Sequence, residues 1–231
     1  MFKQLSLIAL FSLRAYAQAA RGNGNITVAF FADDQQDSCD SNDTSDSLVL
    51  TTSSIPTGFT CFNLTDIFSR SNDTGFQNAT SPVYDSDGDV IQPNGIDWLL
   101  QNRGSFDSKT NYSRVWYEQV NRTGDVEAGE DASWVFYIYA FPDCQQIVDG
   151  DNVDEDDYPW FETSCQTEDG GQCQTVPYSI KSFAINTAAD YNKNHGQCEA
   201  WAYQGAAARF GHSISITVPV LACIAAVTLL L

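Results

Sequence analysis

Residues 133–141 read SWVFYIYAF and carry the strongest strand signal in this 231-residue chain. Aromatic and β-branched residues fill most positions of the stretch, and such residues favour β-strands. Apolar residues occupy both faces of the predicted strand, as in strands that are covered on both sides. We therefore expect residues 133–141 to form a central, buried strand.

Shorter strands are predicted on both sides of this one. Residues 26–31 read ITVAFF and residues 114–120 read RVWYEQV, and both stretches are rich in strand-forming residues. Further short strands are expected at residues 48–52, 59–62 and 179–187. Polar turns separate these segments, so we predict a mainly-β fold, a disulfide-stapled sandwich or set of Greek-key layers with one or two short helices.

Two segments are predicted to be helical. Residues 65–68 are expected to form a single turn. Residues 93–102 are predicted to form a short helix, because Ile96, Leu99 and Leu100 follow the i, i+3, i+4 spacing of a helix face.

The N-terminal end of the chain has the pattern of a signal peptide. Lys3 precedes an apolar stretch at residues 5–13, and Ala15-Tyr16-Ala17 supplies the small residues that signal peptidase requires. The stretch is shorter than the roughly 20 residues that span a bilayer. We expect residues 1–17 to be removed by cleavage after Ala17 or, alternatively, after Ala19.

The C-terminal end has the three parts of a glycosylphosphatidylinositol (GPI) attachment signal. Small residues at 205–208 lead into a short polar spacer, and residues 214–231 are uncharged and largely apolar. We expect the anchor at Gly205, with Ala206 or Ala207 as alternatives, and removal of residues 206–231. A retained transmembrane helix is the competing interpretation, but such helices usually carry Lys or Arg on their cytoplasmic side, and none follows here.

The predicted mature ectodomain, residues 18–205, is strongly acidic. It holds eight of the 11 Lys and Arg and all 30 Asp and Glu, which gives a net charge of −22, against −19 for the full chain. Nucleic acid would be repelled and is excluded as a partner. The acidity favours solubility at a surface, and a cation or a basic partner is the alternative.

Six of the seven cysteines fall within this ectodomain, whereas Cys223 lies in the C-terminal apolar stretch. An even number in an exported chain predicts three disulfides. Six cysteines allow 15 connectivities, and proximity along the chain favours Cys39–Cys61, Cys144–Cys165 and Cys173–Cys198. The spacing contains no CxxC pair and His195 is the single ectodomain histidine, so neither a metal site nor a cofactor is expected.

Seven Asn-x-Ser/Thr sequons, none with a central Pro, predict N-glycosylation in the first half of the ectodomain. The acceptors are Asn25, Asn42, Asn63, Asn72, Asn78, Asn111 and Asn121. Residues 134–205 contain no sequon and are the better candidate for a bare contact face.

This overall plan resembles the small GPI-anchored surface proteins of filamentous fungi. Residues 26–39, ITVAFFADDQQDSC, and residues 59–66, FTCFNLTD, are also similar to the opening of βγ-crystallin-like Greek-key units in fungal secreted proteins. The calcium motif of that family wants two Asn or Asp, two free positions, then Ser/Thr and Ser. Residues 42–47 depart from it at Asp46, so the resemblance implies a fold rather than a calcium site.

A second acidic stretch, residues 85–89 (DSDGD), also invites a calcium interpretation. An EF-hand loop that began at Asp85 would need Gly at Val90 and Glu at Ile96, which excludes it. Asp87-Gly88 between short apolar segments predicts a hairpin instead.

Five tryptophans are candidates for stacking on sugars: Trp98, Trp116, Trp134, Trp160 and Trp201. Core packing is the usual fate of tryptophan, and we single out Trp160 because it follows an acidic run at residues 149–157 in a turn-like context. The binding residues we predict are Asp154, Glu155, Asp156, Asp157, Tyr158 and Trp160. The competing interpretation is that Trp160 packs under a solvated loop.

No catalytic motif is present, since no G-x-S-x-G occurs and His195 lies in a polar segment predicted to be a surface turn. We therefore expect a non-catalytic glycoprotein on the outer face of the plasma membrane or in the cell wall. It would be held by a GPI anchor and would bind a wall polysaccharide or a protein partner. The alternative is a surface glycan hydrolase or transglycosylase with paired carboxylates.

Overall fold

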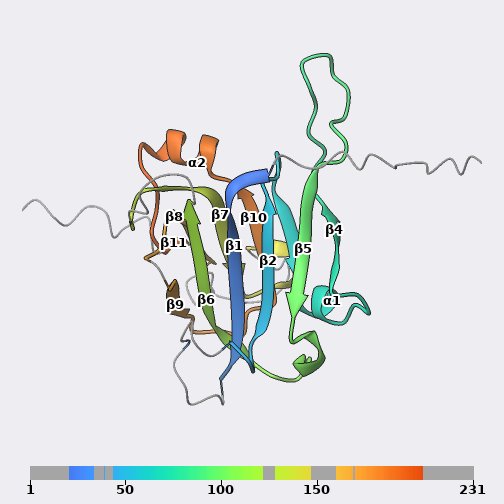
Figure 1. The fold of residues 1–231 in the computed structure, drawn as a ribbon, viewed down its shortest axis with the longest axis vertical. Coiled ribbons are helices and arrows are strands. Elements are labelled where there is room, and N and C mark those ends of the chain that lie inside the picture. The colour runs from blue at the N-terminus through green and yellow to red at the C-terminus, as the bar shows by residue number, and fades with distance from the viewer. Residues whose placement is uncertain are drawn as a thin grey trace, which may run out of the picture.

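The structure, a computed structural model, describes residues 21–33, 39, 44–121, 128–146, 160–168 and 170–204. These residues form two antiparallel sheets packed face to face, a β-sandwich of the predicted mainly-β class (Figure 1). The six-stranded sheet has the order β4 (Thr74–Asn78), β5 (Gly95–Gln101), β2 (Leu48–Ser54), β1 (Arg21–Ala32), β6 (Tyr112–Asn121) and β9 (Gln172–Thr175). The five-stranded sheet has the order β11 (Ala202–Gln204), β8 (Trp160–Cys165), β7 (Asp131–Tyr139), β10 (Ser182–Thr187) and β3 (Thr60–Asn63).

Short helical segments connect or cover the strands. They are α1 (Leu64–Phe68), α2 (Ala188–His195) and the 3₁₀ turns η1 (Arg103–Ser105) and η2 (Pro142–Cys144). Within the described part of the chain, no helix combines the length and apolar character needed to cross a membrane.

The core lies between the sheets and is rich in aromatic rings. Phe30 of β1 and Phe183 of β10 face each other across the interface, with ring centroids 5.0 Å apart, and Phe62 stacks on Phe183 at 4.9 Å. The indole Nε1–H of the fully buried Trp134 donates a 2.7 Å hydrogen bond to the carbonyl of Ser54, so β7 is also tied to β2 by a polar contact. Alternation along each strand sends one set of side chains into this core.

The predicted strands at residues 26–31, 48–52, 59–62, 114–120, 133–141 and 179–187 are all present, and β7 is the central strand of its sheet as expected. The helical turn at residues 65–68 is confirmed as α1. The hairpin at Asp87-Gly88 is confirmed by the antiparallel bridge between Tyr84 and Val90, and Gly88 has φ +86°. Figure 1 shows this hairpin projecting beyond the sandwich.

The helix predicted at residues 93–102 is wrong, because these residues form β5. Ile96, Trp98 and Leu100 point into the core and the residues between them point out. This period of two includes Trp98, which the helical interpretation of Ile96, Leu99 and Leu100 left out.

Other elements also differ from the sequence prediction. Strands β4, β9 and β11 have no counterpart among the predicted strands. Trp160 opens strand β8 rather than lying in a turn, and His195 ends helix α2 rather than lying in a polar turn.

Three disulfides are present, as predicted from the even cysteine count, but the pairing favoured by proximity in sequence is wrong. The observed bridges are Cys39–Cys173, Cys61–Cys144 and Cys165–Cys198. The first attaches the segment after β1 to β9, the second joins β3 to η2, and the third ties β8 to the segment before β11. The fold brings cysteines together that are distant in sequence, and each bridge joins a cysteine in a strand to one outside the strands. The three disulfides indicate an extracellular protein.

Candidate functional site

The outer face of the five-stranded sheet carries the aromatic side chains that the core does not use. In β7, Trp134, Phe136 and Ile138 belong to the core, so Tyr137 and Tyr139 lie on the opposite face. In β8, Phe161 belongs to the core and the alternating positions Trp160 and Glu162 lie on the outer face. Helix α2 lies against β7 on this side, with the Tyr191 ring edge-on to Tyr137.

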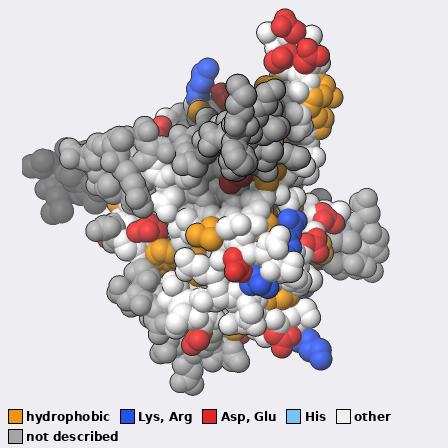
Figure 2. Space-filling view, turned by 45° about the vertical axis from the view of Figure 1, so that its right-hand side comes forward, with side chains coloured by type: hydrophobic (Ala, Val, Ile, Leu, Met, Phe, Trp, Pro, Cys, Tyr) orange, Lys and Arg blue, Asp and Glu red, His pale blue; other side chains and the backbone are white. Residues whose placement is uncertain are grey.

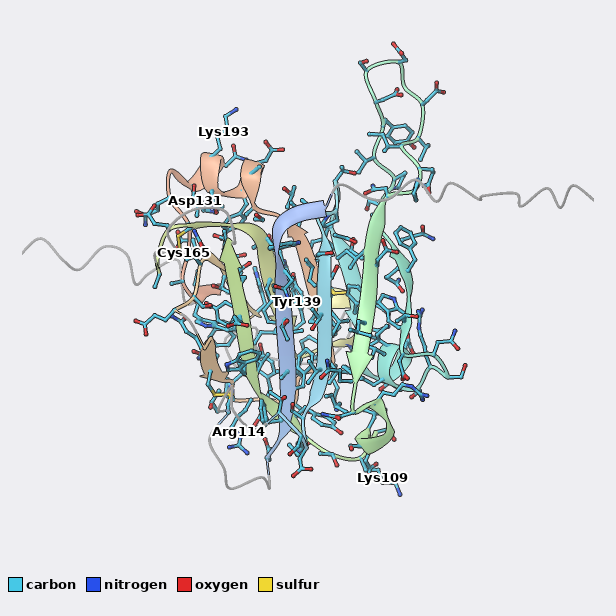
Figure 3. The ribbon with its side chains drawn as sticks, in the orientation of Figure 1. Lys109, Arg114, Asp131, Tyr139, Cys165 and Lys193 are labelled. Carbon is cyan, nitrogen blue, oxygen red and sulfur yellow. A yellow bond between two sulfur atoms is a disulfide. The ribbon has the colours of Figure 1, made fainter. Side chains whose placement is uncertain are left out.

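These residues line a cavity of about 380 Å³, which we call the aromatic groove. Its lining residues are Phe59, Tyr137, Tyr139, Gln146, Trp160, Glu162, Tyr191 and His195. Tyr139 is labelled in Figure 3. The volume lies within the range of small-ligand sites, and aromatic walls with a few polar groups are their usual composition.

Register brings the carboxylate of the groove beside a tyrosine. Tyr137 and Glu162 are direct cross-strand partners, Ala184 pairs with Tyr137 from β10, and Ala202 pairs with Glu162 from β11. Ala184 is fully buried, and neither alanine lines the groove. Phe59 and residues of α2 complete the lining around the Tyr137–Glu162 pair.

The rings of the groove stand at different orientations. Tyr137 and Tyr139 are nearly parallel, with centroids 6.4 Å apart and planes at 19°. Phe59 tilts onto Tyr137 at 5.6 Å, and Tyr191 meets Tyr137 at 6.4 Å and 83°. His195 stacks on Tyr191 with ring centroids 4.1 Å apart, and its Nδ1 lies 2.8 Å from the Tyr191 carbonyl oxygen.

Glu162 supplies a buried carboxylate, with 5% of its surface exposed. The Tyr191 hydroxyl donates a short hydrogen bond to Glu162 Oε1. Burial raises the pKa of Tyr191, and this hydrogen bond and the Glu162 charge raise it further. Burial and then the charge of Glu162 also raise the pKa of Tyr137, and the pKa of Tyr139 is raised by burial and by neighbouring groups that include Glu162. All three phenols therefore stay protonated and neutral at physiological pH.

The structure places one of the predicted binding residues in this groove, namely Trp160, which is half-buried. Asp154, Glu155, Asp156, Asp157 and Tyr158 lie outside the described residues, so their role stays a prediction. The other four tryptophans serve the interior: Trp98, Trp116 and Trp134 are buried, and Trp201 packs edge-on against Tyr117 and Phe136.

Sequence reasoning missed most of the groove. Phe59, Tyr137, Tyr139, Glu162 and Tyr191 were not predicted as site residues. One signal was present, because both tyrosines of SWVFYIYAF share one face of the strand while Trp134, Phe136 and Ile138 share the other. Phenols are suited to a wet surface, since their hydroxyl needs a polar partner.

A second cavity, of about 370 Å³, is a weaker candidate. It is lined in part by Asn63 and Asn78, which are both predicted glycan acceptors, and by Asp66 and Asp143. Its polar groups satisfy one another, because Asn63 Nδ2 donates to Asp66 at 3.0 Å and to Asp143 at 2.7 Å. By contrast, no sequon asparagine is among the described residues that line the aromatic groove.

Among the residues that the structure describes, no group of three His, Cys, Asp or Glu side chains is arranged to hold a metal ion. Within the described lining of the groove, Glu162 is the one carboxylate. A glycoside hydrolase of the usual kind needs two acids, roughly 5–9.5 Å apart. The described lining supplies one hydrogen-bonding acid and five aromatic rings beside His195, and the charge of Glu199 also acts on Tyr191.

No protein-family model, curated protein or solved structure matches this chain. The function must accordingly be argued from the site.

Proposed function

We propose that this chain is a non-catalytic, GPI-anchored cell-surface glycoprotein whose aromatic groove binds a polysaccharide of the surrounding wall. The observation that carries the proposal is the gathering of Phe59, Tyr137, Tyr139, Trp160 and Tyr191 around the Glu162 carboxylate. These residues come from β7, β8, α2 and the segment before β3, so the fold itself assembles the cluster.

Sugar rings match this surface in two ways. Their C–H faces stack on aromatic rings, which offer large flat apolar areas. Their hydroxyls can donate hydrogen bonds to Glu162, and the tyrosine hydroxyls can both donate and accept them. The groove's neutral phenols support this role, because they keep their protons at physiological pH.

Export and anchoring are supported by the disulfides and by the sequence. Three disulfides fit an oxidising compartment. Residues 1–17 and 205–231, which carry the proposed signal peptide and anchor signal, lie outside the described residues. The plan resembles that of small fungal GPI-anchored proteins, which suggests the cell wall as the place where the groove meets its ligand.

A glycan-modifying enzyme is the second candidate, and the buried Glu162 is the observation that favours it. A buried carboxyl beside a sugar is the arrangement of a general acid. The described lining supplies one such group where the reaction requires two, so we place binding first.

The test combines release and attachment. Phosphatidylinositol-specific phospholipase C should release the protein from membranes, and the released protein should sediment with purified wall polysaccharide. Trp160→Ala should reach the surface but lose sedimentation, whereas Tyr84→Ala, at a 59% exposed position on the projecting hairpin, should behave as wild type. Equal sedimentation of the wild type and both variants would refute binding at the groove. Release of reducing ends from the polysaccharide, lost in Glu162→Gln, would favour the enzyme instead.

A further inference from the structure

We infer that the groove selects a cationic amino-sugar polymer, with protonated amino groups held between the aromatic rings and the Glu162 carboxylate. The inference rests on the proposed polysaccharide binding and narrows its substrate class. By this inference, neutral and acidic polysaccharides bind more weakly than the amino-sugar polymer.

The ring geometry provides the first step. Tyr137 and Tyr191 stand at 83° with centroids 6.4 Å apart, and Phe59 approaches Tyr137 at 57° and 5.6 Å. The faces of aromatic rings carry negative potential, and rings that stand at an angle around one hollow can turn more than one such face toward a bound group. Enclosure of this kind is how proteins bind ammonium groups through cation–π attraction.

The carboxylate provides the second step. Glu162 is 5% exposed, is the cross-strand neighbour of Tyr137, and accepts the Tyr191 hydroxyl on one oxygen. Glu162 lines the groove, so its carboxylate lies beside any ligand bound there. Charge-assisted hydrogen bonds are about twice as strong as neutral ones, so an ammonium donor gains more here than a sugar hydroxyl.

The charges around the groove also favour a cationic ligand. No Lys or Arg is among its described lining residues, and the Lys193 side chain on α2 extends away from the molecule (Figure 3). The raised pKa values of Tyr137, Tyr139 and Tyr191 reflect burial first and, in each case, the negative field of Glu162 as well. A field that opposes a phenolate favours a cation at the same place.

The whole chain adds a longer-range attraction. With a formal net charge of −19, it draws in a polycation and repels an acidic polysaccharide. A neutral glucan would stack on the rings but would make no use of the buried charge.

The experiment uses the full chain purified from the producing cells in mild detergent. It measures binding to immobilised glucosamine polymer, to the same polymer fully N-acetylated, and to a neutral β-glucan. We expect at least about tenfold tighter binding to the free-amine polymer, with the preference reduced at about 1 M salt, where the Debye length falls to about 3 Å.

Glu162→Gln is the decisive variant, because the amide keeps the size and still accepts the Tyr191 hydrogen bond. It should weaken binding to the amine polymer about tenfold or more, in line with loss of one partner of a partly buried charge pair. Glu130→Gln, at an exposed position outside the groove, removes the same charge and should change binding less than twofold.

Each outcome bears on a different statement. Equal binding of acetylated and free-amine polymers, with Trp160→Ala defective on both, would overturn the amine inference and leave the proposed polysaccharide binding standing. Equal weakening by Glu162→Gln and Glu130→Gln would also overturn it, since general charge would then explain the preference. Binding to none of the three polymers would refute both proposals.

Discussion

The three disulfides should differ in what they contribute to stability, and the structure sets the order. Each bridge is removed in turn by a double alanine substitution: Cys39 with Cys173, Cys61 with Cys144, and Cys165 with Cys198. Alanine adds no hydroxyl to the buried positions of Cys39 and Cys165. The comparison therefore reports mainly on the cross-link.

The magnitudes follow from the lengths of chain that the bridges close. The paired residues are 134, 83 and 33 positions apart. In an otherwise open chain, a cross-link lowers the entropy of the unfolded state by an amount that grows with the logarithm of this length, which gives about 5.0, 4.6 and 3.7 kcal/mol at 25 °C. These figures are upper bounds, because the two bridges that remain shorten each loop. These losses are a large share of the 5–15 kcal/mol by which proteins of this kind are usually stable.

Urea unfolding followed by tryptophan fluorescence measures the effect. Non-reducing peptide mapping first verifies the two bridges that remain. Removal of Cys39–Cys173 should lower the free energy of unfolding most and should raise the urea m-value most, because the unfolded chain then expands furthest. If removal of Cys165–Cys198 costs more than removal of Cys39–Cys173, loop closure is not the origin of the stabilisation and the reasoning is wrong.

Three further predictions concern the core, the groove tyrosines and a close backbone approach. Trp134→Phe should lower the free energy of unfolding by about 2–4 kcal/mol, because it leaves a void and an unpaired Ser54 carbonyl; a loss below 1 kcal/mol in urea unfolding would contradict this. The pKa of each groove tyrosine is raised above its ordinary 10.0 by burial, so their contribution to stability should be complete below pH 10 and lost as the pH rises further. In tyrosinate absorbance these three phenols should ionise together with unfolding, as should Tyr117, whose pKa burial also raises; ionisation of the groove tyrosines near pH 10 in the folded state would refute their burial. Gly171→Ala should destabilise by about 1–3 kcal/mol more than Gly88→Ala, because both sites have positive φ but the new Cβ would lie 2.5 Å from the Trp116 ring only at the first; equal losses on urea unfolding would argue against that contact.

The hairpin at Asp87-Gly88 and the strand at residues 133–141 were predictable because their signals are local. Gly88 adopts the positive φ that the Asp-Gly pair predicts, and Figure 2 shows acidic side chains gathered at the tip of the hairpin. The helix prediction for residues 93–102 was wrong because two patterns coincide there. Ile96, Leu99 and Leu100 fit a helix face, whereas Ile96, Trp98 and Leu100 fit a strand face. In so short a segment both periods fit, and the choice was made by pairing with β2 and β4.

The aromatic groove was only partly foreseeable. Trp160 could be singled out by its position beside the acidic run, and it does line the groove. Its neighbours could not be named, because the register between β7 and β8 decides that Tyr137 meets Glu162. A shift of one residue would send each of these side chains to the other face of its sheet.

The sequence by itself determined the composition of the molecule: short segments rich in strand-forming residues, six cysteines within residues 18–205, and an excess of acidic residues. These are properties of short segments and of residue counts, so they need no knowledge of which segments meet. The tertiary structure alone decided that Cys39 pairs with Cys173 over 134 positions and that rings from β7, β8, α2 and the segment before β3 surround Glu162. The physical reason is that burial of apolar faces fixes which strands become neighbours, and that choice sums contributions from the whole chain.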